Sequence, residues 1–476
     1  MTSNRSFSEV RAEIRQGEIS ISKLVENHLI NGESEKHLNS FLELFADEAM
    51  EEARKIEEKV ISNKAGKLAG LVLGIKDVFC YKDHKVTAGS RILQGFDSQF
   101  TATAIQRLID EDAIIIGRQN CDEFAMGSSN ENSSYGPTIN AIGKNRVPGG
   151  SSGGSAVGVQ AGICMASIAS DTGGSIRQPA AFCGLVGLKP TYSRISRSGL
   201  VAYGSSFDCV GPITKTVEDS ALLLEVMAGN DPLDSTSSSK PVEKYSELNE
   251  SGKKYKIGFL GTALDSEGLQ DEIRLAYQCS FLKLENFGHQ VAAVEIPFLE
   301  YVLATYYILT TSESSSNLSR FDGIHYGHRS SHAKNLEEVY KLSRSEGFGE
   351  EVKRRIMLGT FALSADYFDA YFTKAQQVRR LIQNSAIELF KSVDFLIMPT
   401  TPTTAFKIGE KASNPLSMYL ADIFTVWANL AGVPAVSIPV GVDNQGLPIG
   451  LQVHANFFEE KKMLQFARDW TELLKK

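Results

Sequence analysis

Two serines in a glycine-rich stretch are the side chains of this sequence best suited to chemistry. Ser151 lies in the run GGSSGGS at residues 149–155, and Ser175 ends the run DTGGS at residues 171–175. Glycine adds no side-chain contacts to a core, but it lets backbone N–H groups come very close to a ligand. Such N–H groups can bind the oxyanion of a tetrahedral intermediate, and here they would come from Thr172, Gly173 and Gly174. The pattern indicates an acyl-transfer site with Ser175 as the nucleophile.

A serine hydroxyl needs a base to become a good nucleophile, and Lys76 is the candidate. It follows the apolar run LVLGI at residues 71–75, so we expect it to be partly desolvated. Desolvation lowers the pKa of a lysine, and keeping it mostly neutral near pH 7 requires a drop of about three units, or ~4 kcal/mol. Ser151 then fits as the relay that passes a proton between Lys76 and Ser175.

Residue types alone leave two simpler interpretations open. A lysine at the end of a strand is usually solvated, and Ser175 could simply cap the turn into residues 176–182. Asp171 and Arg177 flank the nucleophile as a charged pair, which we expect to hold the turn rather than to react.

Other functions of the glycine-rich run fit less well. A phosphate-binding loop needs a lysine and a serine or threonine directly after the glycines, whereas SAV follows Gly154. Residues 149–153 match the G-x-S-x-G element of α/β-hydrolases, but the downstream histidines stand in no recognisable motif. Asp122 and Glu123 have no accompanying set of histidine or cysteine ligands, so we expect no metal. A non-catalytic assembly or anion-binding protein is the alternative from another functional class.

Alternating helices and strands must position these residues. Helices are expected within 6–31 and at 47–64, 103–112 and 271–287, and strands at 68–75, 113–117, 256–261, 290–296, 394–399 and 435–439. This alternation predicts an α/β fold, with a central mixed β-sheet covered by helices on both faces. We expect one domain over 1–476, divided into an N-terminal helical segment (1–65), a catalytic core (66–230), a surface excursion (231–255) and the remaining sheet and substrate-side helices (256–476).

Composition excludes several classes of protein. The net charge of −8 argues against a broad nucleic-acid-binding surface, and no run of eighteen apolar residues indicates a membrane span. The N-terminus has no apolar segment typical of secretion. Six scattered cysteines without a C-x-x-C pair are typical of reduced thiols. We therefore expect a cytoplasmic protein.

The element GGSSGGS followed by DTGGSIRQP resembles the amidase signature family. This resemblance implies Lys76 as the base, Ser151 as a relay serine that follows a cis peptide bond, and Ser175 as the acyl nucleophile. It implies an oxyanion hole formed by Thr172, Gly173 and Gly174, and no metal. The reaction would be amide hydrolysis through an acyl-enzyme.

Segments 122–129, 313–323, 352–360 and 418–425 are also similar to the A subunits of tRNA-dependent amidotransferases. That resemblance implies glutamine as the substrate. Arg355 would bind the α-carboxylate, Asp422 the α-ammonium, and Tyr306 would hydrogen bond nearby. Arg354 and Tyr307 are adjacent alternatives. A stand-alone amidase for small amides is the alternative with the same chemistry.

The same resemblance implies partners. Ammonia from glutamine would pass to a B subunit, which uses ATP and Mg to convert mischarged Glu-tRNA(Gln) to Gln-tRNA(Gln), and a small C subunit would wrap the pair. No cofactor is expected in this chain, and no membrane contact.

Overall fold

One sheet of eleven strands runs through this computed structural model, which describes residues 5–249, 252–411 and 414–474. The strand order is β1-β3-β2-β4-β6-β5-β10-β11-β9-β7-β8. β2 pairs in parallel with β3 and β4, and β7 pairs in parallel with β8 and β9. The remaining pairs are antiparallel, which makes the sheet mixed as predicted. The strands are β1 (Phe41–Leu44), β2 (Val72–Lys76), β3 (Ile114–Gln119), β4 (Ala166–Asp171), β5 (Val186–Lys189), β6 (Cys209–Thr214), β7 (Lys256–Leu260), β8 (Gln290–Val294), β9 (Phe395–Pro399), β10 (Ala435–Val442) and β11 (Pro448–His454).

Helices cover both faces of this sheet, because neighbouring strand residues point to opposite sides. Val72, Ile114 and Ile116 pack into a core with α1–α3 and α5, whereas Leu73 and Ile115 pack on the other face with α4, α7 and α16. The predicted α/β class with two covered faces is confirmed. The helices are α1 (Phe7–Gln16), α2 (Ile21–Ser34), α3 (Ala46–Ile61), α4 (Thr103–Asp110), α5 (Gly153–Gln160), α6 (Arg177–Phe182), α7 (Val217–Met227), α8 (Gly261–Leu264), α9 (Asp271–Asn286), α10 (Leu299–Asn317), α11 (Leu336–Gly347), α12 (Glu350–Ala362), α13 (Lys374–Ser392), α14 (Pro415–Tyr419), α15 (Val426–Ala431) and α16 (Glu460–Leu474).

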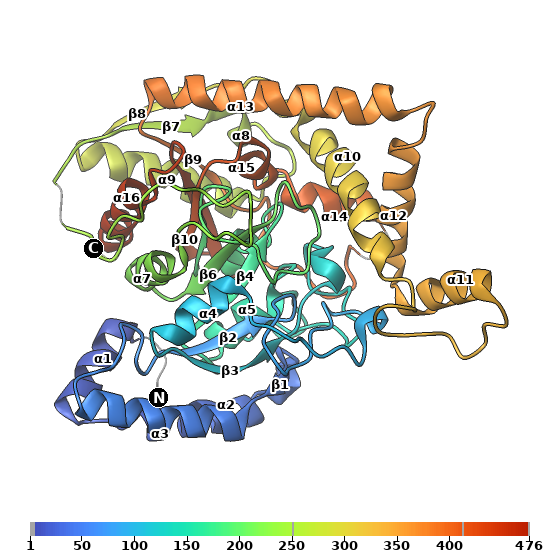
Figure 1. Cartoon of the computed structure of the whole chain (residues 1–476). Coiled ribbons are helices and arrows are strands. Elements are labelled where there is room, and N and C mark those ends of the chain that lie inside the picture. Colours follow the sequence, from blue (N-terminus) through green and yellow to red (C-terminus); the bar gives the residue numbers. More distant parts are fainter. Residues whose placement is uncertain (1–4, 250–251, 412–413, 475–476) are drawn as a thin grey trace.

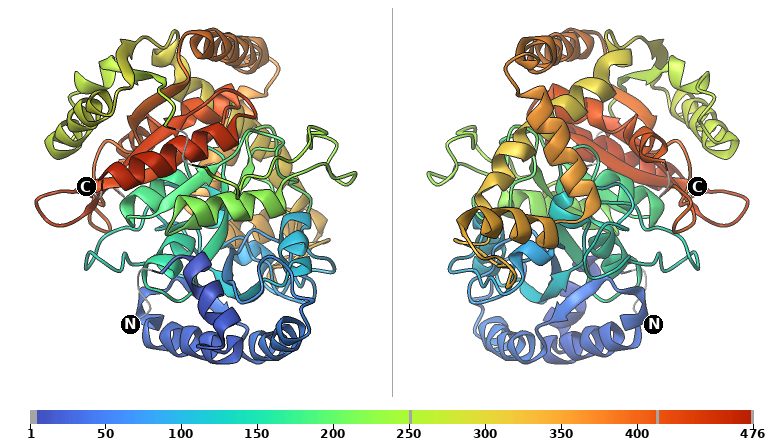
Figure 2. Two further views of the ribbon diagram at one scale, coloured as in Figure 1. Left: turned by 90° about the vertical axis from the view of Figure 1, so that its left-hand side faces the viewer. Right: turned by 90° about the vertical axis from the view of Figure 1, so that its right-hand side faces the viewer.

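The long helices of the second half form a layer of their own. α10 packs against α12, α13 and α15, and α13 crosses the end of the molecule opposite to α1–α3 (Figure 1). Figure 2 shows this separation from two sides, with the N-terminal helices at one end and α13 at the other. The sequence analysis expected substrate-side helices within 256–476 but gave no bounds for any element between 297 and 393.

The predicted surface excursion contains turns and no helix or strand in its described residues, and it is anchored to the core. Arg194 donates to the carbonyl oxygens of Lys240 and Pro241 and to the hydroxyl of Tyr245, which is buried. The finer division of the chain at 65, 230 and 255 stays a prediction. None of the helices in the described ranges is both long and apolar enough to cross a membrane.

Close strand packing predicts a sharp stability difference between two glycines. A Cβ on Gly211, in β6, would lie 2.0 Å from the carbonyl oxygen of Leu188, whereas one on Gly441, in β10, would meet nothing within 4 Å. We expect Gly211→Ala to lower the free energy of unfolding by about 2 kcal/mol or more, because backbone atoms must move. Gly441→Ala is the control and should change it by less than about 0.5 kcal/mol. Equal denaturation midpoints for the two variants would contradict the close pairing of β5 with β6 at Gly211.

Candidate active site

The predicted base and relay serine are in contact at the carboxyl end of β2. Lys76 is the last residue of β2 and is fully buried, and its Nζ donates to Ser151 Oγ at 2.7 Å. The same Nζ donates to Ser170 Oγ at 3.0 Å. Burial lowers the pKa of Lys76 to about 8. The alternative of a solvated lysine is therefore wrong.

Ser170 is a contact that the sequence analysis missed. It lies on β4, which runs parallel to β2, so the two strands end at the same edge of the sheet. A hydroxyl among the small residues of a buried strand was the only signal for it. Two hydroxyl groups thus surround the buried nitrogen, and neither brings a charge.

Packing around Gly150 fixes the position of Ser151. The Gly150–Ser151 peptide bond is cis. The Gly150 N–H donates to Gln178 Oε1 at 3.1 Å, and a Cβ on Gly150 would lie 2.2 Å from Asp122 Oδ2. The Asp122 N–H donates to the Ser151 carbonyl oxygen at 3.1 Å. Asp122, considered above only as a metal ligand, therefore supports the relay serine.

Ser175 lies in the turn between β4 and α6. It is 7% exposed, and no hydrogen bond to its hydroxyl is made within the described part of the chain. The N-cap of α6 is Ile176, without a side-chain cap, so Ser175 does not cap this helix. Its hydroxyl is not engaged in holding the turn.

The turn before Ser175 is held from two sides. Thr425 Oγ1 donates to the Gly173 carbonyl oxygen at 2.5 Å, and the Gly174 N–H donates to Asp171 Oδ1 at 2.8 Å. Gly174 has a φ of 132°, and a Cβ there would lie 2.3 Å from Thr425 Oγ1, so only glycine fits. Because the Gly174 N–H is directed at Asp171, its predicted part in an oxyanion hole stays a prediction, and Thr172 and Gly173 are the better candidates.

Asp171 and Arg177 form the expected pair, and both side chains are fully buried. Arg177 Nε and Nη2 donate to the two oxygens of Asp171 at 3.0 and 3.1 Å. Burial alone would raise the pKa of Asp171, but Arg177 outweighs it and holds that pKa at about 2. Arg177 also donates to Gln452 and Asn429, which links the turn to β11 and α15.

The predicted substrate residues gather beside this turn. Asp422 Oδ2 accepts from Ser128 Oγ at 2.7 Å and from the Tyr307 hydroxyl at 3.0 Å, and burial raises the pKa of Asp422 to about 7. Tyr306 lies against the turn itself, since a Cβ on Gly173 would be 2.4 Å from its ring. Both tyrosines thus reach the site, Tyr306 at the nucleophile turn and Tyr307 at Asp422.

Arg355 is buried among aromatic rings, whereas Arg354 lies nearer to solvent. The Arg355 guanidinium lies 5.4–5.6 Å from the ring centres of Tyr203, Tyr307 and Tyr419. It donates to the Tyr203 hydroxyl at 2.7 Å and to Glu351 at 2.8 Å. Both arginines border a cavity of about 180 Å³, which Ser129 and Gly127 also line. Arg355 is the better positioned of the two to act as a fixed charge.

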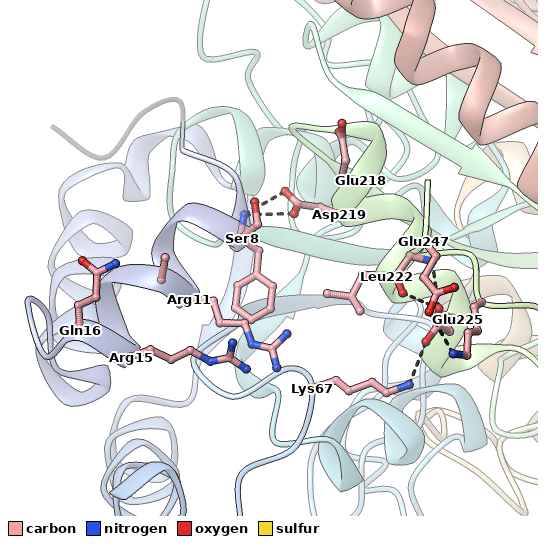
Figure 3. A pocket seen from close by; sticks show the side chains of 14 residues that line it. Ser8, Arg11, Arg15, Gln16, Lys67, Glu218, Asp219, Leu222, Glu225 and Glu247 are labelled. Atoms are coloured by element: carbon pink, nitrogen blue, oxygen red, sulfur yellow. Dashed lines mark hydrogen bonds and ion pairs between the residues drawn. The ribbon is translucent and has the colours of Figure 1, made fainter. Parts of the chain in front are cut away.

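A larger cavity of about 710 Å³ lies elsewhere, between α1, α7 and residues 244–247 (Figure 3). Among its lining residues, Lys67 pairs with Glu225, and Asp219 accepts the N–H of Phe7 at the start of α1. These contacts join the N-terminal helix to the core, and the cavity shares no residue with the cluster around Lys76. In the described ranges no group of three or more His, Cys, Asp or Glu side chains could hold a metal ion.

Comparisons with known proteins identify the family of this chain. A family model described as Amidase covers residues 24–464. The chain belongs to the amidase family. Among its members, the A subunit of glutamyl-tRNA(Gln) amidotransferase from Koribacter versatilis is 50% identical over 468 residues, which are 97% of each chain. The protein of the same description from Geobacillus sp. (strain WCH70) is 50% identical over 98% of this chain and 96% of that one.

Solved structures of amidases agree with the fold. The A subunit of the Thermotoga maritima glutamyl-tRNA(Gln) amidotransferase is 39% identical, with a TM-score of 0.78 over 94% of this chain and 90% of that one. The peptide amidase of Stenotrophomonas maltophilia is 26% identical, with a TM-score of 0.84 over 99% and 97%. The predicted family and fold class are thereby confirmed.

The buried pair beside Ser175 predicts a large stability effect. Replacing Arg177 with methionine leaves the Asp171 charge buried without its partner, which typically costs about 3–5 kcal/mol of unfolding free energy. Arg354→Met is the matched control, because the Arg354–Glu351 pair is partly exposed and should contribute less than about 1 kcal/mol. Similar losses for the two variants in denaturant titrations would show that the buried pair does not hold the turn.

Proposed function

We propose that this amidase is the glutamine-hydrolysing subunit of the tRNA-dependent amidotransferase that converts mischarged Glu-tRNA(Gln) to Gln-tRNA(Gln). The observation that carries the proposal is the 50% identity, over almost the whole chain, to proteins described as the A subunit of that enzyme. The buried Lys76–Ser151 contact supports the chemistry, and the charges at Arg355 and Asp422 support the substrate.

In the proposed reaction the Ser175 hydroxyl attacks the side-chain amide carbon of glutamine. Its proton passes to Ser151, while the Ser151 proton passes to the neutral amine of Lys76, along the contact seen at 2.7 Å. The developing oxyanion accepts hydrogen bonds from the backbone N–H groups of Thr172 and Gly173, since the Gly174 N–H is bound to Asp171. The proton returns to the leaving nitrogen, which departs as ammonia and leaves a glutamyl ester on Ser175. Water then attacks this ester, with Lys76 again accepting a proton through Ser151, and glutamate is released.

The substrate's two charges have matching groups in the site. The Arg355 guanidinium would bind the α-carboxylate, and its aromatic surroundings hold its orientation. Asp422 would bind the α-ammonium, which favours the ionised carboxylate despite its burial. Tyr306 would pack against the bound side chain beside Gly173.

The partners follow from the same proposal. A B subunit would receive the ammonia, use ATP and Mg to activate the glutamyl group and bind the mischarged tRNA, and a C subunit would complete a cytoplasmic heterotrimer. This chain would need no cofactor. The stand-alone amidase remains the second candidate, because the peptide amidase shares the fold with a TM-score of 0.84.

The triad is tested with Ser175→Ala in the complex co-expressed with the partner subunits. We expect ammonia release from glutamine to fall at least about 10³-fold. Ser155→Ala, which removes a buried hydroxyl without a hydrogen bond to the described residues, is the control and should stay within about twofold of wild type. Unchanged turnover by Ser175→Ala would refute the enzymatic proposal.

The pKa of Lys76 predicts the pH profile of kcat. Because burial disfavours its ammonium form, the neutral base predominates only above pH 8. We therefore expect kcat to rise with pH to a plateau, with a midpoint near 8, in steady-state assays between pH 6 and 9.5. A kcat that falls over this range would exclude Lys76 as the base.

Arg355→Met separates the two candidate functions. For a glutamine site we expect KM for glutamine to rise about 10- to 100-fold, since a charge-assisted contact is lost. Hydrolysis of propionamide, which has neither charge, should change less than about twofold. An isolated wild-type chain that hydrolyses propionamide better than glutamine would instead favour the stand-alone amidase.

A further inference from the structure

One short segment, residues 422–429, forms hydrogen bonds to the turn that carries Ser175. Thr425 Oγ1 donates to the Gly173 carbonyl oxygen, and Asn429 Nδ2 donates to the Asp171 carbonyl oxygen at 3.1 Å and to Asp171 Oδ1 at 3.0 Å. Thr425 is fully buried and Asn429 nearly so. The segment thus contacts both ends of the backbone stretch that precedes Gly174.

The same segment begins with Asp422. The Thr425 N–H and hydroxyl both approach the Asp422 carbonyl oxygen, at 3.0 and 3.1 Å, so residues 422–425 form one closed turn. The Asp422 side chain accepts hydrogen bonds from Ser128 and Tyr307. Two hydrogen bonds therefore lead from the backbone of Asp422 to that of Gly173.

We infer that Thr425 is a positioning residue that couples substrate binding at Asp422 to the orientation of the Gly173–Gly174 peptide. This inference rests on the proposed function, in which Asp422 binds the α-ammonium and the N–H groups of Thr172 and Gly173 bind the oxyanion. A substrate ammonium that fixes Asp422 also fixes the turn 422–425, and through Thr425 it fixes the peptide next to the nucleophile. Amides with an α-ammonium group are thereby expected to have a higher kcat as well as a lower KM.

Steric limits make Thr425 suited to this task. A Cβ on Gly174 would lie 2.3 Å from Thr425 Oγ1 and 2.6 Å from Thr425 Cβ, so the two residues are in close contact. The Gly173 carbonyl oxygen accepts from Thr425 while the Gly174 N–H donates to Asp171. These are the two polar groups of one peptide unit, and holding both prevents its rotation.

The first test removes only the hydroxyl, in the complex with the partner subunits. Thr425→Val keeps the shape. We expect kcat for glutamine to fall about tenfold or more with KM within about twofold, since a shift of the Gly173–Gly174 peptide displaces both the adjacent Ser175 and the Gly173 N–H, which weakens the transition state more than the ground state. Thr425→Ser keeps the donor and should restore at least half of the wild-type kcat. Thr214→Val is the control, because this buried threonine donates to the Thr216 carbonyl oxygen at the far end of β6. A wild-type kcat in Thr425→Val, or an equal loss in Thr425→Ser, would overturn the inference.

A double-mutant cycle tests the coupling itself. Asp422→Asn should lower kcat for glutamine in the wild-type background but not further in the Thr425→Val background. Effects on kcat that multiply would show two independent contributions and would refute the coupling.

The proposed function can fail separately, because a wild-type complex that releases no ammonia from glutamine would refute it. In that case the rate at which a fluorophosphonate labels Ser175 still tests Thr425. We expect that rate to fall in Thr425→Val and to be restored in Thr425→Ser.

Discussion

The constraint on which the site depends is a lysine in the protein interior that forms no salt bridge with any residue the structure describes. Lys76 is fully buried, and its two hydrogen bonds go to the hydroxyl groups of Ser151 and Ser170. A carboxylate in the same place would keep the nitrogen protonated and useless as a base. The nearby carboxylates of Asp122, Asp171 and Asp208 raise the pKa of Lys76 only through space, and each is bound by other donors. Asp171 accepts from Arg177, Asp208 from Thr172, and Asp122 from the amides of Asn130 and Asn132.

The arrangement of the sheet explains how this constraint is met. β2 and β4 are parallel neighbours, so Lys76 and Asp171 end their strands at one edge, where the following loops converge. β10 pairs with β5 on one side and with β11 on the other, and both pairings are antiparallel. This pairing brings residues from the C-terminal third of the chain against the same turn. Gln452 on β11 and Asn429 on α15 both bind Arg177. The nucleophile turn is thus enclosed by segments nearly three hundred residues apart in the chain.

The sequence revealed the parts of the site that follow from local chemistry. The glycine-serine runs, the lysine after an apolar strand and the strand–helix alternation depend on short-range patterns, and they led to Lys76, Ser151, Ser175 and the fold class. Ser170, Thr425 and the packing of Tyr203 and Tyr419 on Arg355 could not be found in this way, because only tertiary packing brings these residues to the site. The bounds of α10, α12 and α13 were not assigned for a related reason. Buried threonine and serine residues on α10, such as Thr310, Thr311 and Ser314, obscure its apolar face.

The sequence separation of these contacts also bears on synthesis. Lys76, Ser151 and Ser175 are all translated within the first 175 residues, but Thr425, Asn429 and Gln452 emerge from the ribosome long afterwards. Until they arrive, the nucleophile turn lacks three of the groups that hold it, and β5 lacks its neighbour β10. The nascent chain therefore carries its reactive groups without the means to orient them. An incomplete chain would therefore hold Ser175 in a turn that lacks the support of Thr425, Asn429 and Gln452.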